Sequence, residues 1–288
     1  MLSIRHLSKT YPNGVLALDD ISLDMPAGMF GLLGPNGAGK SSLMRTIATL
    51  QLPDSGTLNF DGIDIVAEPD RIRRALGYLP QDFGVYPKVS ALDLLDHFAV
   101  LKGYSKASER KTVVEALLAQ VNLWDARKRA VASYSGGMRQ RFGIAQALLG
   151  DPRLIIVDEP TAGLDPEERN RFLNLLASIG ADQLVILSTH IVEDVTDLCP
   201  QMAVIAKGRV VLRGKPNDAI AALQAKVWRR TLKRDELSLI KAQHQVLSER
   251  FVGGQPVVHI FAEENPGDGF EPVAPGLEDV YFHKLRAA

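Results

Sequence analysis

The feature that most constrains this chain is the stretch GPNGAGKS at residues 34–41, which follows the pattern G-x-x-x-x-G-K-S. A short apolar run at 29–33 precedes it and indicates a buried parallel strand, and residues 41–50 follow with helical spacing. Glycines let the backbone curl so that successive N–H groups point inward, and they leave room for a phosphate to approach. The stretch therefore predicts a nucleotide-binding loop between a strand and a helix, although a tight structural turn would use the same glycines.

Within this loop, individual residues have expected tasks. Lys40 should reach the terminal phosphates, the hydroxyl of Ser41 should bind Mg²⁺, and the N-terminus of the following helix adds partial positive charge. The residues expected to contact the nucleotide are Gly34, Pro35, Asn36, Gly37, Ala38, Gly39, Lys40, Ser41 and Ser42.

Three more apolar runs predict strands that end in polar residues. Ligands of open α/β sheets bind beyond the carboxyl ends of the strands, so these polar residues should converge on the glycine loop. The runs are LGYLPQ at 76–81, which ends at Gln81, LIIVDEP at 154–160, which contains Asp158 and Glu159, and LVILSTH at 184–190, which ends at His190.

Taken together, the polar residues at the strand ends suit the binding of Mg²⁺ and the activation of a water molecule. Asp158 could hold the Mg²⁺ shell through water, and Gln81 could contact the metal and water as a neutral ligand. Glu159 could polarise an attacking water, whereas His190 could contact the γ-phosphate or that water. Each residue also has an ordinary alternative: the two acids could begin a solvated helix, Gln81 could be a loop residue, and His190 could be a polar strand end.

The alternation of strands and helices predicts an α/β layered core. Residues 1 to about 25 alternate apolar and polar around a turn at Pro12-Asn13-Gly14, which indicates antiparallel strands. Helical periodicity over 91–102 and 107–123 predicts that the section up to about Gly150 is largely helical.

The last part of the chain has a different character. The stretch MAVIAKGRVVLRG at 202–214 indicates a hairpin that turns at Lys207-Gly208. After about Pro216, a charged stretch around 218–249 indicates a helix, and short strand-like pieces such as PVVHIF follow. We therefore expect residues 217–288 to form a small appended α+β domain.

The stretch YSGGMRQRFGIAQALL predicts a further helix whose start could bind an anion. Ser135 is suited to be its N-cap, and Gly136 and Gly137 follow directly. Simple helix capping would explain these residues. Alternatively, because the glycine loop already supplies one anion site, this surface could meet a phosphate that another subunit binds.

In this order, GPNGAGKSS, Gln81, YSGGMRQR, LIIVDEP, GLDP and STH resemble the ATP-binding cassette (ABC) ATPase family over roughly residues 2–215. The resemblance implies a P-loop NTPase core of residues 1–216, with an antiparallel β subdomain and an inserted helical subdomain at about 84–150, followed by the C-terminal α+β extension. Tyr134 departs from the family pattern, because leucine is commonest at this position, which does not contact phosphate.

The resemblance also implies a head-to-tail dimer that encloses two ATP molecules. Each ATP would lie between the glycine loop of one chain and Ser135, Gly136 and Gly137 of the other. Asp165, in GLDP, would lie at the dimer seam. Tyr11 would stack on adenine, although it could instead pack as an aromatic residue at a strand edge.

These features predict the reaction ATP + H₂O → ADP + Pi, with ATP and Mg²⁺ as bound groups. Positioning and charge stabilisation by Mg²⁺, Lys40 and the opposing helix N-terminus would do most of the catalysis, with Glu159 as general base and His190 as γ-phosphate partner.

The predicted role of the chain is the ATP-hydrolysing subunit of a multi-subunit ABC transporter. Its partners would be a second cassette, either this chain or a paralogue, and a separate transmembrane permease. Residues 82–104 would contact the permease, or would be an ordinary loop and core helix.

Composition limits the other partners. A formal net charge of −1 gives no bulk attraction to nucleic acid. The single cysteine, Cys199, suits a reducing cytosol, and no apolar run is long enough to cross a bilayer. We therefore expect a cytoplasmic chain held at the inner face of the cell membrane by its membrane partner.

The ending PGLEDVYFHKL at 275–285 resembles the LEDVF-like ending of exporter cassettes and favours export, although it could simply be the apolar face of a terminal helix.

Two other classes of protein remain open on the sequence alone. Soluble ABC ATPases that act on ribosomes or DNA usually join two cassettes in one chain or carry long coiled-coil insertions, and neither feature is found here. A purely regulatory nucleotide-binding module would not need the intact set of Gln81, Glu159 and His190.

Overall fold

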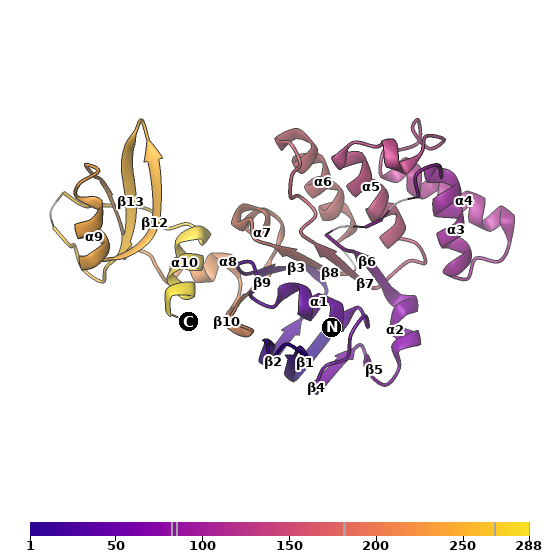
Figure 1. The fold of residues 1–288 in the computed structure, drawn as a ribbon, viewed down its shortest axis with the longest axis horizontal. Coiled ribbons are helices and arrows are strands. Elements are labelled where there is room, and N and C mark those ends of the chain that lie inside the picture. Colours follow the sequence, from indigo (N-terminus) through magenta and orange to yellow (C-terminus); the bar gives the residue numbers. More distant parts are fainter. Residues whose placement is uncertain (82, 85, 181–182, 268, 288) are drawn as a thin grey trace.

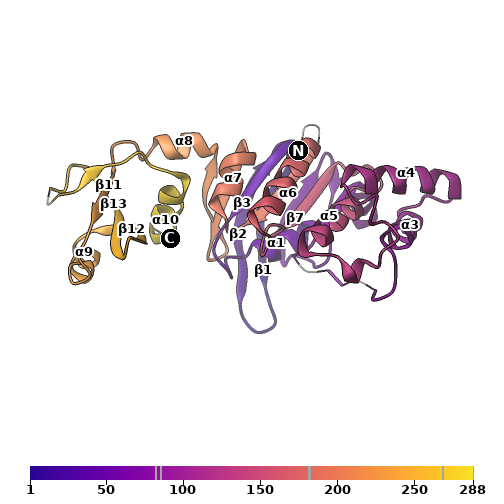
Figure 2. The ribbon, with the colours of Figure 1, turned by 90° about the horizontal axis from the view of Figure 1, so that it is seen from above.

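The computed structural model describes residues 1–81, 83–84, 86–180, 183–267 and 269–287. Within these residues it contains three β-sheets, with a helical section at one end of the molecule and a small sheet with short helices at the other (Figures 1 and 2). Helices cover a mostly parallel central sheet, and this is the P-loop NTPase type of α/β fold that the sequence predicts.

The central sheet has six strands in the order β10-β9-β3-β8-β7-β6. Neighbouring strands are parallel except β9 and β10, which form the predicted hairpin. The hairpin turns at Lys207-Gly208, whose φ angles of 49° and 78° are typical of such a two-residue turn. The strands are β3 (Gly28–Leu33), β6 (Leu76–Leu79), β7 (Leu154–Asp158), β8 (Leu184–Thr189), β9 (Gln201–Ala206) and β10 (Arg209–Gly214).

Both faces of the central sheet are buried, which explains why its strands are continuous apolar runs. On one face, Leu32 and Ile156 pack in a cluster with α1 and the N-terminal antiparallel sheet. On the other face, Leu33 and Val157 pack in a second cluster with α5, α6 and α7. The helices are α1 (Lys40–Ile47), α5 (Gly136–Ala147), α6 (Pro166–Ile179) and α7 (Val192–Leu198).

The N-terminal sheet is antiparallel, as the sequence predicts, with strand order β2-β1-β4-β5. The turn after Tyr11 is closed by a hydrogen bond from the Gly14 N–H to the Tyr11 carbonyl, with N and O 2.9 Å apart. A short helix, α2, then leads into β6 of the central sheet. The elements are β1 (Leu2–Thr10), β2 (Leu16–Met25), β4 (Ser55–Phe60), β5 (Ile63–Asp64) and α2 (Pro69–Ala75).

The two helices expected before α5 are confirmed, with slightly earlier ends. They are α3 (Ala91–Leu101) and α4 (Ala107–Gln120), and a 3₁₀ turn, η1 (Val131–Ser133), leads into α5. Ser90 caps α3 by accepting a hydrogen bond from the Asp93 N–H. These elements lie beside one another at the end of the molecule away from the C-terminal sheet (Figure 1).

The prediction of a charged helix around 218–249 is wrong. This stretch contains two strands and two short helices, because β11 pairs with β13 and β14, and β12 pairs with β13. Pairing with strands later in the chain overrides the local helical preference of its charged residues. The elements are α8 (Pro216–Ala221), β11 (Val227–Thr231), α9 (Leu237–Gln243), β12 (Gln245–Val252), β13 (Gln255–Phe261), β14 (Glu271–Pro272) and α10 (Leu277–Ala287).

The terminal helix α10 joins the C-terminal sheet to the rest of the chain. It contacts α7, α8 and β10. Its Val280 and Tyr281 belong to the same apolar cluster as Val195 and Cys199 of the α7 region. The buried core therefore continues across the expected boundary at 216/217.

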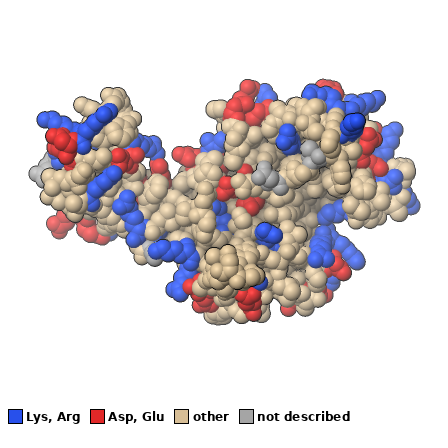
Figure 3. Space-filling view, viewed as in Figure 1, with Lys and Arg blue, Asp and Glu red and all other residues tan. Residues whose placement is uncertain are grey.

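The surface in Figure 3 carries Lys and Arg side chains intermixed with Asp and Glu, with no large area of one sign on that face. Within the described residues, every helix is too short or too polar to span a membrane.

Candidate functional site

Many of the residues predicted to bind nucleotide line one pocket of about 450 Å³. The pocket lies where β3 runs into the glycine loop and α1 begins, beside the carboxyl ends of β6 and β7. The lining residues are Tyr11, Val15, Ala17, Pro35, Asn36, Gly37, Ala38, Gly39, Lys40, Ser41, Ser42, Gln81 and Glu159.

The glycines of the loop are required by its geometry. Gly37 and Gly39 have φ angles of +78° and +108°, a region that favours glycine. A Cβ on Gly39 would also stand 2.4 Å from the Ala17 carbonyl oxygen, and one on Gly34 would stand 2.4 Å from that of Ile205. The loop thus opens onto the first turn of α1, where backbone N–H groups lack intrahelical acceptors and face an anion site.

The ammonium group of Lys40 is buried at the centre of this pocket. Its Nζ donates to the carbonyl oxygens of Gly34 at 2.7 Å and Pro35 at 3.3 Å, and lies 3.6 Å from Glu159 Oε1. Burial lowers the pKa of Lys40, while the nearby carboxylates of Glu159 and Asp158 act in the opposite direction. An ammonium in this setting gains from a further anion, such as a phosphate.

Glu159 connects Lys40 to His190. Its Oε2 lies 3.2 Å from His190 Nδ1, and its side chain is 12% exposed. The backbone at Glu159 has a φ angle of 48°, and its N–H donates to the Ser188 carbonyl at 2.8 Å. The carboxylate is therefore held between two basic groups at the open side of the glycine loop. The structure brings together Lys40, Glu159 and His190, as the strand ends predict.

Asp158 has the properties of a cation ligand. Its side chain is buried, and among the described residues Oδ1 has no hydrogen-bond partner. Burial raises the pKa of Asp158, and the neighbouring hydroxyls of Ser188 and Ser41 oppose that rise. Carboxylate and hydroxyl oxygens are the donors that Mg²⁺ prefers, so Asp158 and Ser41 fit the predicted metal.

Tyr11 borders the same pocket through a fixed hydroxyl. Its OH lies 3.0 Å from Ser42 Oγ and donates to Gln51 Oε1 at 3.0 Å. Tyr11 follows the last residue of β1, so the N-terminal sheet supplies this edge of the pocket. Gln81 also lines the pocket and is exposed, two residues beyond the end of β6.

The start of α5 is formed as predicted but does not belong to this pocket. Ser135 is the N-cap, and its Oγ accepts a hydrogen bond from the Met138 N–H at 3.2 Å. Ser135 and Gly136 are exposed and are absent from the pocket lining. Tyr134, which departs from the family pattern, is buried, and its OH donates to the Ala126 carbonyl at 2.9 Å.

Asp165 is likewise outside the pocket. It is the N-cap of α6, where its Oδ1 accepts a hydrogen bond from the Glu168 N–H at 2.9 Å, and the residue is exposed. Within one chain, the structure therefore groups the glycine loop with Gln81, Asp158, Glu159 and His190. It leaves Ser135, Gly136, Gly137 and Asp165 outside that group.

Little in the sequence points to the residues that support these groups. Arg141 Nη2 lies 3.4 Å from Glu168 Oε2, which ties α5 to α6. A Cβ on Gly137 would stand 2.2 Å from Glu168 Oε2, so a side chain at this position would displace that carboxylate. The run Arg139-Gln140-Arg141, which follows Ser135-Gly136-Gly137-Met138, is the sequence signal that points to Arg141. No comparable pattern surrounds Gln51.

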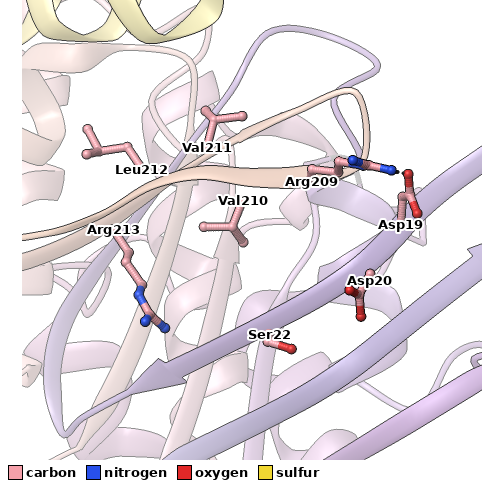
Figure 4. Close-up of a pocket in the computed structure, with 8 residues that line it drawn as sticks. All are labelled: Asp19, Asp20, Ser22, Arg209, Val210, Val211, Leu212 and Arg213. Carbon is pink, nitrogen blue, oxygen red and sulfur yellow. Dashed lines mark hydrogen bonds and ion pairs between the residues drawn. The ribbon is translucent and has the colours of Figure 1, made fainter. Parts of the chain in front are cut away.

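A second groove, of about 620 Å³, lies between β2 and β10 (Figure 4). Arg209 and Asp19 point toward each other there, with Nε and Oδ2 2.6 Å apart. Both strands are at the edges of their sheets, and the described lining of this groove includes no residue of the glycine loop. It offers paired charges rather than a phosphate cradle, so the glycine-loop pocket is the candidate site.

Comparison with known proteins agrees with this geometry. The chain matches the family model described as ABC transporter over residues 18–162. It is 37% identical over 262 residues to the daunorubicin/doxorubicin resistance ATP-binding protein DrrA of Streptomyces peucetius, a match that covers 90% of this chain and 77% of that protein. It is 38% identical over 203 residues to the ABC transporter ATP-binding protein NatA of Bacillus subtilis, a match that covers 69% of this chain and 82% of that protein.

Among solved structures, a dimeric ATP-binding cassette in a post-hydrolysis state, bound to ADP and Pi, is similar with a TM-score of 0.68 and 26% identity. The match covers 75% of this chain and 98% of that one. On sequence and fold together, the chain belongs to the family of ABC transporter ATP-binding proteins.

Proposed function

We propose that this chain is the ATP-hydrolysing subunit of an ABC exporter and works with a separate transmembrane protein. The observation that carries the proposal is the arrangement of Lys40, Glu159 and His190 around the glycine loop, at the carboxyl ends of neighbouring strands. The reaction is ATP + H₂O → ADP + Pi.

The chain's own groups supply positioning and charge. The γ-phosphate would compete with Glu159 for Lys40 and would separate the two side chains. Glu159 would then be free to accept a proton from the attacking water, while His190 contacts the γ-phosphate. Asp158 and Ser41 would hold Mg²⁺, which neutralises phosphate charge when it is bound, and Gln81 is the proposed neutral ligand to the metal and water.

The second half of the site comes from another cassette. Ser135, Gly136 and Gly137 form a capped helix start, where Ser135 and Gly136 are exposed, and Asp165 caps α6. A helix start that faces solvent can receive a phosphate bound elsewhere. ATP would thus draw two chains together, and hydrolysis would remove the anion that both need.

A groove suited to the transmembrane partner lies beside the predicted contact segment. It has a volume of about 400 Å³ and lies among β6, the end of α3 and the end of α5. Leu101 at its edge is 71% exposed, and Phe98 and Arg73 also line it. Residues 82 and 85 of the predicted segment 82–104 lie outside the described residues. A mostly apolar groove that Arg73 and Lys102 also line fits a short amphipathic helix of a permease.

Export is favoured by the relatives and by the end of the chain. DrrA is named as a daunorubicin/doxorubicin resistance protein, and other relatives are named as Nod factor export ATP-binding proteins. The ending at 275–285 resembles exporter cassettes as well. The alternative, a soluble ABC ATPase that acts on ribosomes or nucleic acid, has no support among these relatives. A cytoplasmic position, peripheral to the membrane through the permease, follows from the proposal.

The test is the substitution Glu159→Gln. We expect ATP binding to be retained, a stable ATP-dependent dimer to be detected by size-exclusion chromatography with light scattering, and turnover to fall by about a hundredfold or more. Glu271→Gln, an exposed acid of β14, is the matched control and should behave as the unmodified chain. Normal turnover in Glu159→Gln would show that Glu159 is not the general base. Turnover by a strict monomer would show that the ATP site is not shared between two chains.

A further inference from the structure

We propose that Asp194 is a positioning residue for ATP hydrolysis. It fixes α7, the helix that follows His190, to α6, the helix that Asp165 caps. The proposal rests on the proposed function, because it concerns how the groups of that site are held. Asp194 lies on α7, and it is not among the described residues that line the glycine-loop pocket.

The carboxylate of Asp194 is fully buried and both of its oxygens are used. Oδ1 accepts from Arg169 Nε at 2.8 Å and lies 2.6 Å from Arg169 Nη2. Oδ2 accepts from the Thr161 hydroxyl at 2.7 Å. Bonds to an ionised group at these lengths are strong and directional, and a buried carboxylate that lost them would be left uncompensated.

Each partner belongs to a different part of the proposed site. Thr161 lies two residues after Glu159 and is itself buried. Arg169 is in the first turns of α6, and its N–H donates to the carbonyl of the N-cap residue Asp165 at 2.9 Å. Asp194 therefore joins the loop that carries the proposed general base to the helix start expected at the dimer seam.

The helix α7 is well placed to pass on this constraint. It begins at Val192, two residues beyond His190, and the Ile191 N–H donates to Thr189 Oγ1 at 3.0 Å. Val195 packs directly on β3, where a Cβ on Gly31 would stand 2.5 Å from Val195 Cγ1. Val195 thus packs α7 closely on β3, and the carboxylate of Asp194 adds directional hydrogen bonds to α6 and to the loop after Glu159.

Loss of these hydrogen bonds should impair the chemical step more than nucleotide binding. The glycine loop would bind phosphates through β3 and α1, whereas the hydrogen bonds of Asp194 run to Thr161 and Arg169. Glu159 and His190 must be placed to within about an ångström, and a misplacement of that size costs up to about a hundredfold in rate. Because Asp165, which is expected at the dimer seam, caps α6, the same loss should also weaken communication between the two ATP sites.

The sharpest test compares Thr161→Val with Thr161→Ser. Valine keeps the shape of threonine but removes the hydroxyl that donates to Asp194, whereas serine keeps it. For Thr161→Val we expect an ATP affinity within about threefold of the unmodified chain, turnover per bound nucleotide reduced about tenfold or more, and a Hill coefficient for ATP that falls toward 1. Thr161→Ser should retain most of the turnover and the cooperativity.

Asp194→Asn is the second variant, and Glu236→Gln is its matched control. Glu236 also accepts from an arginine, Arg230, and from a backbone N–H, that of Lys233, but lies in the C-terminal extension. We expect Asp194→Asn to reproduce Thr161→Val, and Glu236→Gln to leave turnover per bound nucleotide and cooperativity unchanged even if it lowers the melting temperature.

Three results would overturn the proposal. The first is a turnover in Thr161→Val equal to that of the unmodified chain. The second is a fall of turnover and of the number of nucleotide sites in the same proportion, which would make the contact merely structural. The third is a loss of turnover in Thr161→Ser as large as that in Thr161→Val. If the unmodified chain itself hydrolysed no ATP, the proposed function would fail instead.

Discussion

The packing of α7 on the central sheet can be tested at Gly31. This residue lies in β3, and a Cβ added there would stand 2.5 Å from Val195 Cγ1 and 2.8 Å from Cγ2. Such contacts force α7 or the valine to move, which costs about 1–3 kcal/mol in a packed core. Alanine is better than glycine inside a strand by about 0.5–1 kcal/mol. The free energy of unfolding of Gly31→Ala should therefore fall by about 1 kcal/mol, and by no more than about 2.5 kcal/mol.

A second substitution tells whether Val195 causes that loss. Val195→Ala removes Cγ1 and Cγ2 and leaves only Cβ, 3.2 Å from the added methyl group. Alone it should cost about 2 kcal/mol through the cavity that it leaves. In the double variant, the methyl group added at position 31 would fill that space, so the two losses should fall short of additivity by at least about 1 kcal/mol.

The assay is equilibrium unfolding in urea followed by circular dichroism, with ATP turnover measured on the same samples. Gly31→Ala should lose turnover through the displaced helix after His190, and the double variant should regain part of it. Additive losses within about 0.5 kcal/mol would refute the reasoning, since they would show that the two side chains do not compete for one space.

Three other predictions follow from single sites. Ser135→Arg should block turnover and spare ATP binding, because it obstructs only the helix start offered to the second cassette; full turnover would contradict the shared site. Tyr134→Phe should lower stability by about 1 kcal/mol, seen as a melting temperature lower by about 2–3 °C, because the hydroxyl that donates to Ala126 is lost. Burial raises the pKa of Cys199 from 9.0 to about 12, so its thiolate fraction at pH 8 should be about a thousandfold below that of the unfolded chain, and thiol labelling of the folded chain should be slower by at least that factor, because burial also limits access to the reagent. The stability linked to that thiol is complete below pH 9.0 and is lost as the pH rises toward 12.

The part of the site that could be predicted is encoded in short stretches of sequence. Glycines at 34, 37 and 39 indicate a loop because each is required there, either by a positive φ angle or by the close approach of a backbone carbonyl. Asp158, Glu159 and His190 could be placed together because the carboxyl ends of parallel strands meet at one edge of a sheet. The structure confirms the strands, and the geometry of these side chains follows from them.

The contacts that hold the site could not be predicted, because they join residues far apart in sequence. Thr161 and Asp194 are 33 positions apart, and nothing in the intervening residues indicates that a hydroxyl and a carboxylate will meet. A buried carboxylate on a short helix has the same local pattern as a solvated one. Only the packing of α7 between α6 and β3 distinguishes the two cases.

The misassigned stretch at 218–249 failed for a related reason. Its arginines and lysines favour a helix locally, but β11 is held between β13 and β14, and Trp228 Nε1 donates to the Ala262 carbonyl at 3.1 Å. Strand pairing between segments this far apart in the sequence is a property of the whole extension, and the composition of one segment does not reveal it.

The C-terminal extension therefore shares part of its apolar core with the cassette. Leu277, Val280 and Tyr281 of α10 are buried in the same apolar cluster as Val195, so the outer side of α7 is covered by residues beyond 216. The similarity to DrrA of Streptomyces peucetius, which extends over 262 residues, also reaches past the cassette core. The helix after His190 is thus held by β3 beneath it, by α6 through Asp194, and by α10 from the extension.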